Sequence, residues 1–223
     1  MFVQLEQRRR SRFPWVTLLL VIACVSIFVW LSLVPSVQRI QLVASWGLVP
    51  VRLMHSDWLS LELLRLVSAL FVHADWLHLV GNLLFLVIFG VPTERALGRG
   101  LYLSLFLVGG ALANLMGALS VSQASIAIVG CSGAVSAVMG GYLALYPRAD
   151  LGVVLPLGFY FEFVRVPALL LIGLWVLLQL LFTWAGPSFG AVVWWTHIAG
   201  FVFGLLCALL IRPALARRQR RGY

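Results

Sequence analysis

Four polar residues lie in segments that are otherwise apolar enough to cross a membrane. Ser132 and His197 belong to two separate late segments, and His78 and Asn82 share an earlier one. Polar groups inside membrane segments are costly, so each is a functional candidate by default. A serine hydroxyl becomes a nucleophile only when a base takes its proton, and histidine is the usual base. The set therefore predicts hydrolysis by Ser132 with His197 as general base.

The other polar groups are suited to stabilising negative charge. His78 and Asn82 are four residues apart, so they share a helix face and can point at the same oxygen. The backbone N–H groups of Cys131 and Ser132 stand at the start of a predicted helix, where the potential is positive. We expect these four groups to form an oxyanion hole. No acidic residue occurs in the apolar segments at the level of these polar residues. The prediction is therefore a Ser-His dyad without a triad acid.

Glycines surround the predicted dyad. Gly130 and Gly133 lie on either side of the serine, and Gly200 follows His197 by about one helical turn. Glycine permits tight backbone conformations, and small residues let membrane helices touch backbone to backbone. We therefore expect the helices of Ser132 and His197 to pack closely enough for the two side chains to meet.

The composition is that of a membrane protein. Of the 223 residues, 62% are hydrophobic and only 10% are charged, whereas a soluble domain carries roughly a quarter charged residues. All 16 basic residues are arginines and the net charge is +9, but most arginines flank apolar segments, as membrane orientation requires. This placement predicts a lipid bilayer as partner and argues against nucleic acid.

Cysteine chemistry is not predicted. Cys24, Cys131 and Cys207 lack the spacing of a disulfide framework, and no paired-cysteine or His-Glu-x-x-His zinc motif occurs. We therefore expect no disulfide, no cofactor and no bound metal.

Six apolar runs approach the length of about 20 residues that a helix needs to cross a bilayer. They cover residues 15–33, 78–97, 101–120, 132–147, 166–184 and 192–211. The first follows four arginines, but it exceeds the roughly 7–15 residues of a signal-peptide core, so we expect an uncleaved transmembrane helix. The predicted fold class is an all-α polytopic membrane protein, built as a bundle of six transmembrane helices.

Arginine counting predicts the orientation. With the N-terminus inside, 13 of the 16 arginines lie on the inner side, and only Arg39, Arg52 and Arg65 lie outside. Both termini are therefore expected in the cytoplasm. The expected organisation is one membrane domain (1–223) with a basic N-terminus (1–13), an outer interfacial loop (35–77) and a basic tail (213–223).

This orientation brings the polar residues to one depth. The second, fourth and sixth runs all proceed from the outside inward, and the four polar side chains lie in their first turns. The predicted active site therefore lies toward the outer side of the membrane.

The motifs that carry this chemistry resemble those of the rhomboid intramembrane serine proteases. The family's Gly-x-Ser-Gly occurs at 130–133, its His-x-x-x-Asn at 78–82 and its His-x-x-Gly at 197–200, in this order. His73 stands at the expected five-residue spacing before His78, and a Glu-x-x-x-Gly turn follows at 94–98.

The similarity extends over roughly residues 61–211, and the segment 142–179 is similar to bacterial members. The resemblance implies an integral, multi-pass protein of the bacterial inner membrane that cleaves transmembrane proteins near the outer end of their helices. It implies the roles already assigned to the dyad and the oxyanion donors. Together with the predicted arrangement of the segments, the resemblance also suggests that the outer loop and the link 185–191 are lids over the site. The fifth run, which lacks polar residues at this depth, is the expected lateral gate.

Two positions depart from the family pattern. Its Trp-Arg pair is Leu64-Arg65 here, and Ser136 stands where some members carry a tyrosine that stacks on the catalytic histidine. The sequence thus leaves open what orients His197. A relative that binds membrane helices without cutting them is the alternative function. A histidine proton relay in a transporter is disfavoured because no acidic residue joins it. The sequence indicates neither the substrate nor the oligomeric state.

Overall fold

A computed structural model describes residues 13–57, 60–157, 160–185 and 194–220. It is mostly helical, which confirms the all-α polytopic class. The helices of the bundle are α1 (Trp15–Leu33), α5 (Trp76–Leu97), α6 (Arg99–Ser120), α7 (Ser132–Leu145), α8 (Ala168–Ala185) and α9 (Trp194–Arg220). Five of these six are long and apolar enough to cross a membrane, and α7 is shorter.

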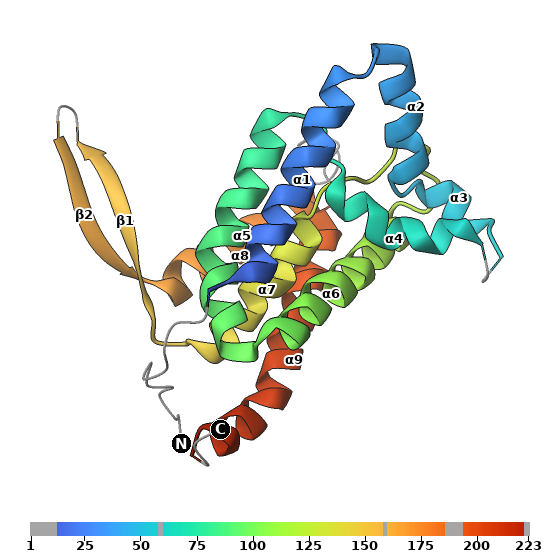
Figure 1. Ribbon diagram of the computed structural model, residues 1–223. Coiled ribbons are helices and arrows are strands. Elements are labelled where there is room, and N and C mark those ends of the chain that lie inside the picture. The colour runs from blue at the N-terminus through green and yellow to red at the C-terminus, as the bar shows by residue number, and fades with distance from the viewer. Residues whose placement is uncertain (1–12, 58–59, 158–159, 186–193, 221–223) are drawn as a thin grey trace.

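The ends of the bundle agree with an even number of crossings. The start of α1 and the end of α9 lie at the same end of the bundle (Figure 1). Residues 1–12, 186–193 and 221–223 lie outside the described residues, and with them most of the basic N-terminus and the expected lid 185–191. The sidedness relative to the membrane stays a prediction from the arginines.

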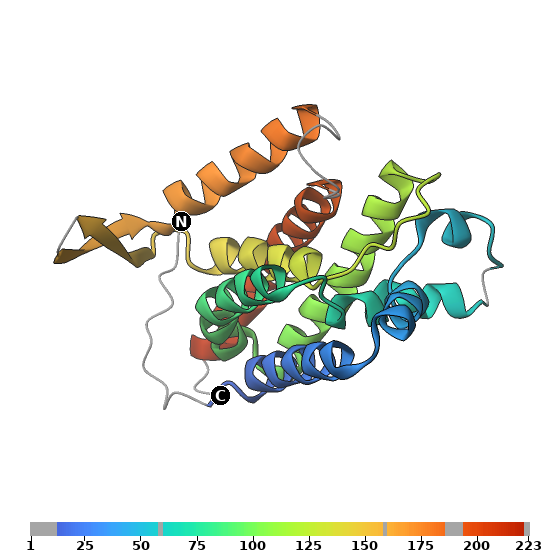
Figure 2. The same ribbon diagram turned by 90° about the horizontal axis from the view of Figure 1, so that it is seen from above.

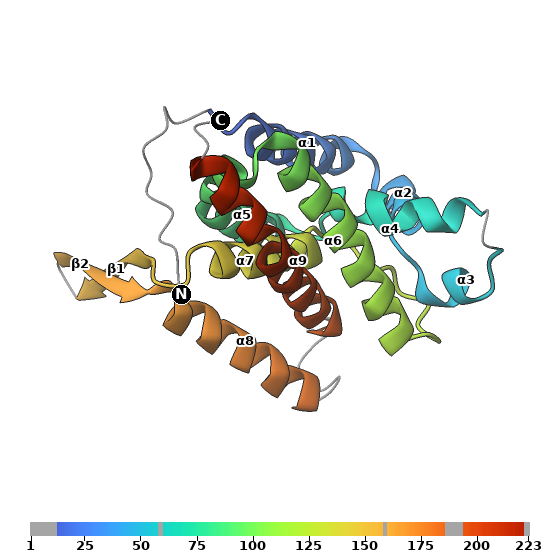
Figure 3. The same ribbon diagram turned by 90° about the horizontal axis from the view of Figure 1, so that it is seen from below.

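Helix α7 is the centre of the bundle, with α5, α6, α8 and α9 around it (Figure 3). All of its 14 residues except Ser132 and Leu143 are buried. At 1.5 Å per residue it is about 21 Å long, which is less than the roughly 30 Å of a bilayer core. Neighbouring helices rather than lipid therefore surround α7 along nearly its whole length.

Helices α7 and α9 pack backbone against backbone. A Cβ atom on Gly200 would collide with the carbonyl of Gly133, and one on Gly204 would collide with the carbonyl of Ala137. Only glycine fits at these two positions of α9. The predicted close approach of the two helices is thus present, and it depends on the missing side chains.

A buried carboxyl group holds the start of α1 against α5. Glu94 accepts hydrogen bonds from the Val16 N–H (3.0 Å), the Thr17 N–H (2.8 Å) and the Thr17 hydroxyl (2.8 Å). The Tyr102 hydroxyl of α6 lies 3.2 Å from the Thr17 hydroxyl. The first N–H groups of a helix have no partners within the helix, and a carboxylate there also interacts favourably with the helix dipole.

We expect Glu94→Ala to destabilise the fold by about 3 kcal/mol, because it leaves a buried N–H group, a partly buried N–H group and a buried hydroxyl without a charged acceptor. Thermal unfolding in detergent micelles measures the effect. Glu62→Ala is the control, since Glu62 forms a partly exposed pair with Arg65 at 2.7 Å and such pairs contribute about 0–1 kcal/mol. Equal losses in the two variants would contradict the anchoring role of Glu94.

The outer loop folds into short helices: α2 (Ser36–Trp46), α3 (Pro50–Met54), η1 (Leu61–Leu64), α4 (Arg65–Ser68) and η2 (Ala69–Phe71). Trp58 and Leu59 lie outside the described residues. The loop is fastened to the segment that leads to Ser132, because Leu48 and Ile128 exchange backbone hydrogen bonds of 3.0 and 2.7 Å. The loop therefore holds in place the segment that leads into α7.

Between α7 and α8 the chain forms an antiparallel hairpin that the sequence analysis did not predict. Strand β1 (Asp150–Leu157) pairs with β2 (Tyr160–Pro167), with Asp150 opposite Pro167. The hairpin projects from the bundle (Figure 1). The predicted fifth run begins too early at Val166, because β-branched and aromatic residues favour strand up to Pro167. Helix α8 then begins at Ala168.

Candidate active site

The structure brings Ser132 and His197 together at the centre of the bundle. Ser132 is the first residue of α7, and His197 lies in the first turn of α9. The Ser132 Oγ and the His197 Nε2 are 2.8 Å apart, a good hydrogen-bond distance. The glycine contacts between the two helices, with Gly133 against Gly200, explain how side chains far apart in sequence reach each other.

The other ring nitrogen of His197 has an amide partner on α8. The His197 Nδ1 lies 2.7 Å from the Gln179 Oε1. An amide oxygen can only accept, so Nδ1 carries the proton and Nε2 is free to accept the serine hydroxyl proton. This tautomer is assigned from the hydrogen-bond network, and it is the one that general-base catalysis requires.

Gln179 corrects the sequence interpretation of the fifth run. That run was expected to lack polar residues at the depth of the site, yet Gln179 of α8 is buried in contact with His197. The available signal was the same as for the other site residues, namely a strongly polar side chain within an apolar run. The partner of Gln179, His197, becomes apparent only from the packing of α8 against α9.

Aromatic rings cover the imidazole of His197. The Trp175 and Trp194 ring centres lie 6.1 and 5.8 Å from that of His197. Ser136, which stands where some members of the family that the sequence resembles carry a stacking tyrosine, donates a 2.7 Å hydrogen bond to the Ser132 carbonyl. The orientation of His197, which the sequence left open, thus comes from Gln179 and two tryptophans rather than from the position of Ser136.

His78 and Asn82 line the same site beside Gly130. Gly130 has φ of +108°, a conformation that favours glycine. A Cβ atom there would lie 2.6 Å from the His78 Nε2 and 3.5 Å from the Asn82 Nδ2. His78 is set by the start of α5, because its N–H donates to the Asp75 carboxylate at 2.8 Å. Both side chains therefore face the loop that carries Ser132.

The Asn82 Nδ2 is a buried donor with no hydrogen-bond partner within the described part of the chain. Buried polar groups are paired in the great majority of cases, so an orphaned donor next to a nucleophile suggests a ligand. The backbone around the serine is also held in place, since the Gly130 N–H donates to the Ala69 carbonyl at 2.9 Å.

The start of α7 adds further donors. The Val135 N–H bonds to the Cys131 carbonyl at 2.8 Å, which begins the helical ladder. The N–H groups that precede Val135 in the helix have no intrahelical acceptor. They include that of Ser132, one of the predicted oxyanion donors.

The side chain of Cys131 contacts His73. The Cys131 Sγ lies 3.5 Å from the His73 Nε2, and both residues are buried. Burial, and to a smaller extent the nearby His78 ring, lowers the pKa of His73 to about 4, so this ring is neutral at pH 7. His73 supports the site through packing, with its ring centre 5.3 Å from that of His78.

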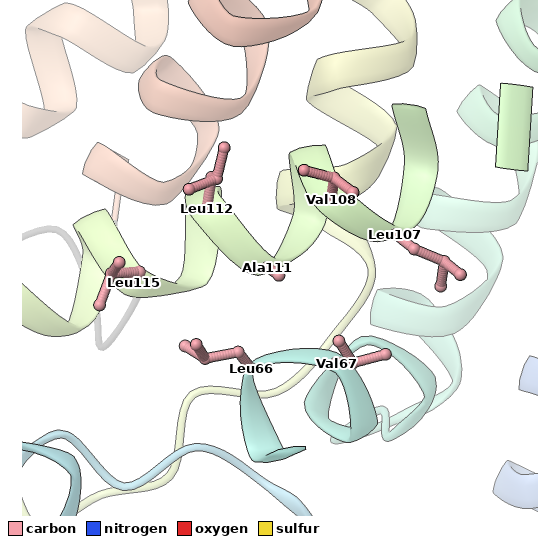
Figure 4. A pocket seen from close by; sticks show the side chains of 7 residues that line it. All are labelled: Leu66, Val67, Leu107, Val108, Ala111, Leu112 and Leu115. Carbon is pink, nitrogen blue, oxygen red and sulfur yellow. The ribbon is translucent and has the colours of Figure 1, made fainter. Parts of the chain in front are cut away.

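An apolar hollow elsewhere on the surface has no part in this chemistry. It lies between α4 and α6 and is lined by Leu66, Val67, Leu107, Val108, Ala111, Leu112 and Leu115 (Figure 4). None of these side chains can act as an acid, a base or a nucleophile. The groups that can act chemically are instead those gathered around Ser132, from α5, α7 and α9.

Comparisons with known proteins agree with the motifs. A family model described as the Rhomboid domain matches residues 60–214. Rhomboid protease GlpG of Salmonella choleraesuis (strain SC-B67) is 29% identical over 203 residues, which cover 90% of this chain and 64% of that protein. Rhomboid-related protein 2 of Mus musculus is 41% identical over 81 residues, which cover 36% of this chain and 26% of that protein.

A plant relative, Rhomboid-like protein 11, chloroplastic, of Arabidopsis thaliana, is 46% identical over 72 residues, which cover 32% of this chain and 25% of that protein. The chain thus spans less than two thirds of the length of these curated relatives. The family model, in contrast, covers most of the chain, from the short helices of the outer loop to α9. On this match the chain is an integral, multi-pass membrane protein that belongs to the rhomboid family.

Proposed function

We propose that this protein is an intramembrane serine endopeptidase with a Ser132-His197 dyad. The observation that carries the proposal is the 2.8 Å contact between the Ser132 Oγ and the His197 Nε2. Family membership supports a protease at the level of the reaction class. A binding protein that recognises membrane helices without cutting them is the alternative, and loss of either dyad residue would have favoured it.

The proposed reaction proceeds in two halves. The Ser132 Oγ attacks the substrate carbonyl carbon while the His197 Nε2 takes the hydroxyl proton. The carbon–nitrogen bond then breaks, and His197 gives the proton to the departing amine. A water molecule, activated by the same nitrogen, hydrolyses the acyl-enzyme and restores the serine hydroxyl. No carboxylate bonds to His197 among the described residues, since its Nδ1 partner is the Gln179 amide.

Negative charge on the substrate oxygen is stabilised by donors that are already in place. The Asn82 amide, the His78 ring and the N–H groups of Cys131 and Ser132 at the start of α7 are the proposed set. The unpartnered Asn82 Nδ2 supports this assignment, because a preorganised donor contributes most where water is excluded.

The proposed substrates are transmembrane proteins, which reach the site sideways past α8. This helix is the least embedded of the bundle: only Ala168, Ile172 and Gln179 are buried among its residues. Figures 2 and 3 show it at the edge of the bundle, on the side opposite α1. Movement of α8 would open the site to a helix in the bilayer. It would also draw Gln179 away from His197.

The experiment that tests the function uses purified protein in lipid vesicles with a model transmembrane substrate. We expect cleavage near the outer end of the substrate helix, with mass spectrometry of the new termini locating the cut. A soluble peptide that carries the same cut site but no membrane helix is the matched control, and it should be cut far more slowly. Tight binding of the membrane helix without any cleavage would favour the non-proteolytic alternative.

Gln179 is proposed as a positioning residue for His197. We expect Gln179→Leu to lower kcat about 10- to 100-fold with little change in KM, because general-base catalysis contributes about 10²- to 10⁴-fold and Gln179 supports it indirectly. Gln179→Glu should retain much more activity, since a carboxylate also accepts from Nδ1. Cleavage rates over a range of substrate concentrations separate the two parameters.

Thr183→Val is the matched control on the same helix. Among the described residues, the Thr183 hydroxyl donates to the Gln179 carbonyl of the same helix at 2.7 Å. This variant loses a polar group but no contact with the dyad, so its kcat should stay near that of the wild type. A kcat for Gln179→Leu that matches the control would remove Gln179 from the mechanism.

A further inference from the structure

The side chains of two cysteines and one histidine lie close together next to the start of α7. Cys24 comes from α1, His73 from the segment before α5, and Cys131 from the residue that precedes α7. The sulfur atoms of the two cysteines and a ring nitrogen of His73 all lie within 4.8 Å of one another, and all three residues are buried. These three ligand types lie in three distant segments, so they form no metal motif with a recognisable spacing in the sequence.

We propose that Cys24, His73 and Cys131 form a binding site for a thiophilic divalent cation of the zinc type. The first support is the distance between the donor atoms. With bonds of about 2.3 Å to sulfur and 2.0–2.1 Å to nitrogen, two donors on one tetrahedral Zn²⁺ lie roughly 3.6 Å apart. The Cys131 Sγ and the His73 Nε2 are already 3.5 Å apart. The Cys24 sulfur needs to approach by about 1 Å at most to complete a three-ligand site.

The second support is the charge of the loaded site. Binding of M²⁺ releases one proton from each thiol and forms two metal–thiolate bonds, so the cluster of cation, two thiolates and neutral imidazole has no net charge. A neutral cluster suits a buried position within a membrane protein, where net charge is costly. Thiolate and imidazole ligands select zinc-like or copper-like ions, whereas Ca²⁺ and Mg²⁺ require oxygen ligands.

The third support is that the protein itself leaves His73 poorly paired. Only 3% of the residue is exposed. Its Nδ1 makes no well-aligned hydrogen bond within the described residues; the Phe71 backbone interacts with the ring only in a looser geometry. Its Nε2 faces the Cys131 sulfur, a weak partner. Buried polar side chains are normally well bonded. A cation held by His73 and the two thiols accounts for this arrangement.

The position of the site predicts its effect on catalysis, which rests on the proposed function. Cys131 directly precedes Ser132 and supplies one of the proposed oxyanion donors. A cation would draw the Cys131 side chain toward α1 and so displace the peptide that carries this donor. We therefore expect Zn²⁺ to inhibit cleavage reversibly, and a chelator to restore it.

Binding is tested first, on Ser132→Ala protein in detergent, so that the result does not depend on activity. Cd²⁺ titration followed by thiolate-to-metal charge-transfer absorption, and Zn²⁺ competition against a fluorescent chelator, should each report one equivalent. Adding Cys24→Ala should weaken binding by at least about 100-fold, more than the 10- to 100-fold that loss of an outer-shell partner costs. Cys207→Ala removes the remaining free cysteine, which lies on α9 away from the cluster. This variant should bind like the parent.

Inhibition is tested second, on active protein. Zn²⁺ should slow the wild type and Cys207→Ala equally, and it should not slow Cys24→Ala, whose cleavage without metal should match the wild type. Cys24→Ser serves as a second variant if unfolding temperatures show that Cys24→Ala is poorly folded. Absence of cadmium–thiolate absorption, or equal binding by the Cys24 variants and the parent, overturns the site. Binding without inhibition overturns only its effect on cleavage.

Discussion

Substitution of Ser132 by alanine will abolish cleavage of a transmembrane substrate, lowering the rate by roughly 10⁴-fold or more. The reason is that the hydroxyl in contact with the His197 Nε2 is the only proposed nucleophile. A dyad acts as a unit, so the loss should be nearly as large for His197→Ala. The measurement is the rate of product formation in lipid vesicles, with equal protein amounts confirmed by mass.

Ser136→Ala is the matched control for this prediction. Ser136 is a buried serine one turn further along α7, and its hydroxyl bonds to the Ser132 carbonyl rather than to His197. The variant should keep most of its activity. A serine-directed phosphonate should label the wild type and Ser136→Ala at Ser132, and should not label His197→Ala. Labelling of a different residue, or undiminished cleavage by Ser132→Ala, would falsify the mechanism.

Substitution of Asn82 by alanine will slow turnover by about 10²- to 10³-fold, the usual effect of removing one oxyanion donor. The fold should survive, because the Asn82 Nδ2 makes no hydrogen bond in the described structure and none is broken when it is removed. A buried donor without a partner costs free energy in the resting protein. Thermal stability is therefore expected to stay constant or to rise slightly.

Asn114→Ala is the control for this prediction, because it should lower stability without lowering kcat. The Asn114 Nδ2 donates to the Leu66 carbonyl at 2.9 Å and so joins α6 to the outer loop. Its loss should lower the unfolding temperature and leave the kcat of the folded protein nearly unchanged. If Asn82→Ala instead behaves like Asn114→Ala, with lower stability and normal kcat, Asn82 has a structural role and not an oxyanion role.

Much of the fold follows from local properties of the chain. Apolar runs of membrane-spanning length predict helices because an unpaired backbone cannot exist in lipid, and α1, α6 and α8 lie close to the predicted runs. The hairpin between Asp150 and Pro167 lies outside these predictions, because an apolar run by itself does not distinguish a strand from the start of a helix. Such a distinction depends on pairing between segments.

The candidate chemical groups can be identified from the type and setting of each residue along the chain. Ser132, His197, His78 and Asn82 are recognisable because polar groups in apolar helices are costly and need a reason to be there. The glycines at 133, 200 and 204 are likewise readable, since small residues at helical spacing predict backbone contact.

The partners of these side chains, in contrast, depend on how the helices pack in three dimensions. The pairing of His197 with Gln179, the unpartnered amide of Asn82 and the cluster of Cys24, His73 and Cys131 all join residues from different segments. Such contacts depend on how the helices rotate and tilt against one another. Helix rotation is set by the sum of many packing contacts and not by any local pattern, so no spacing in the chain could reveal it.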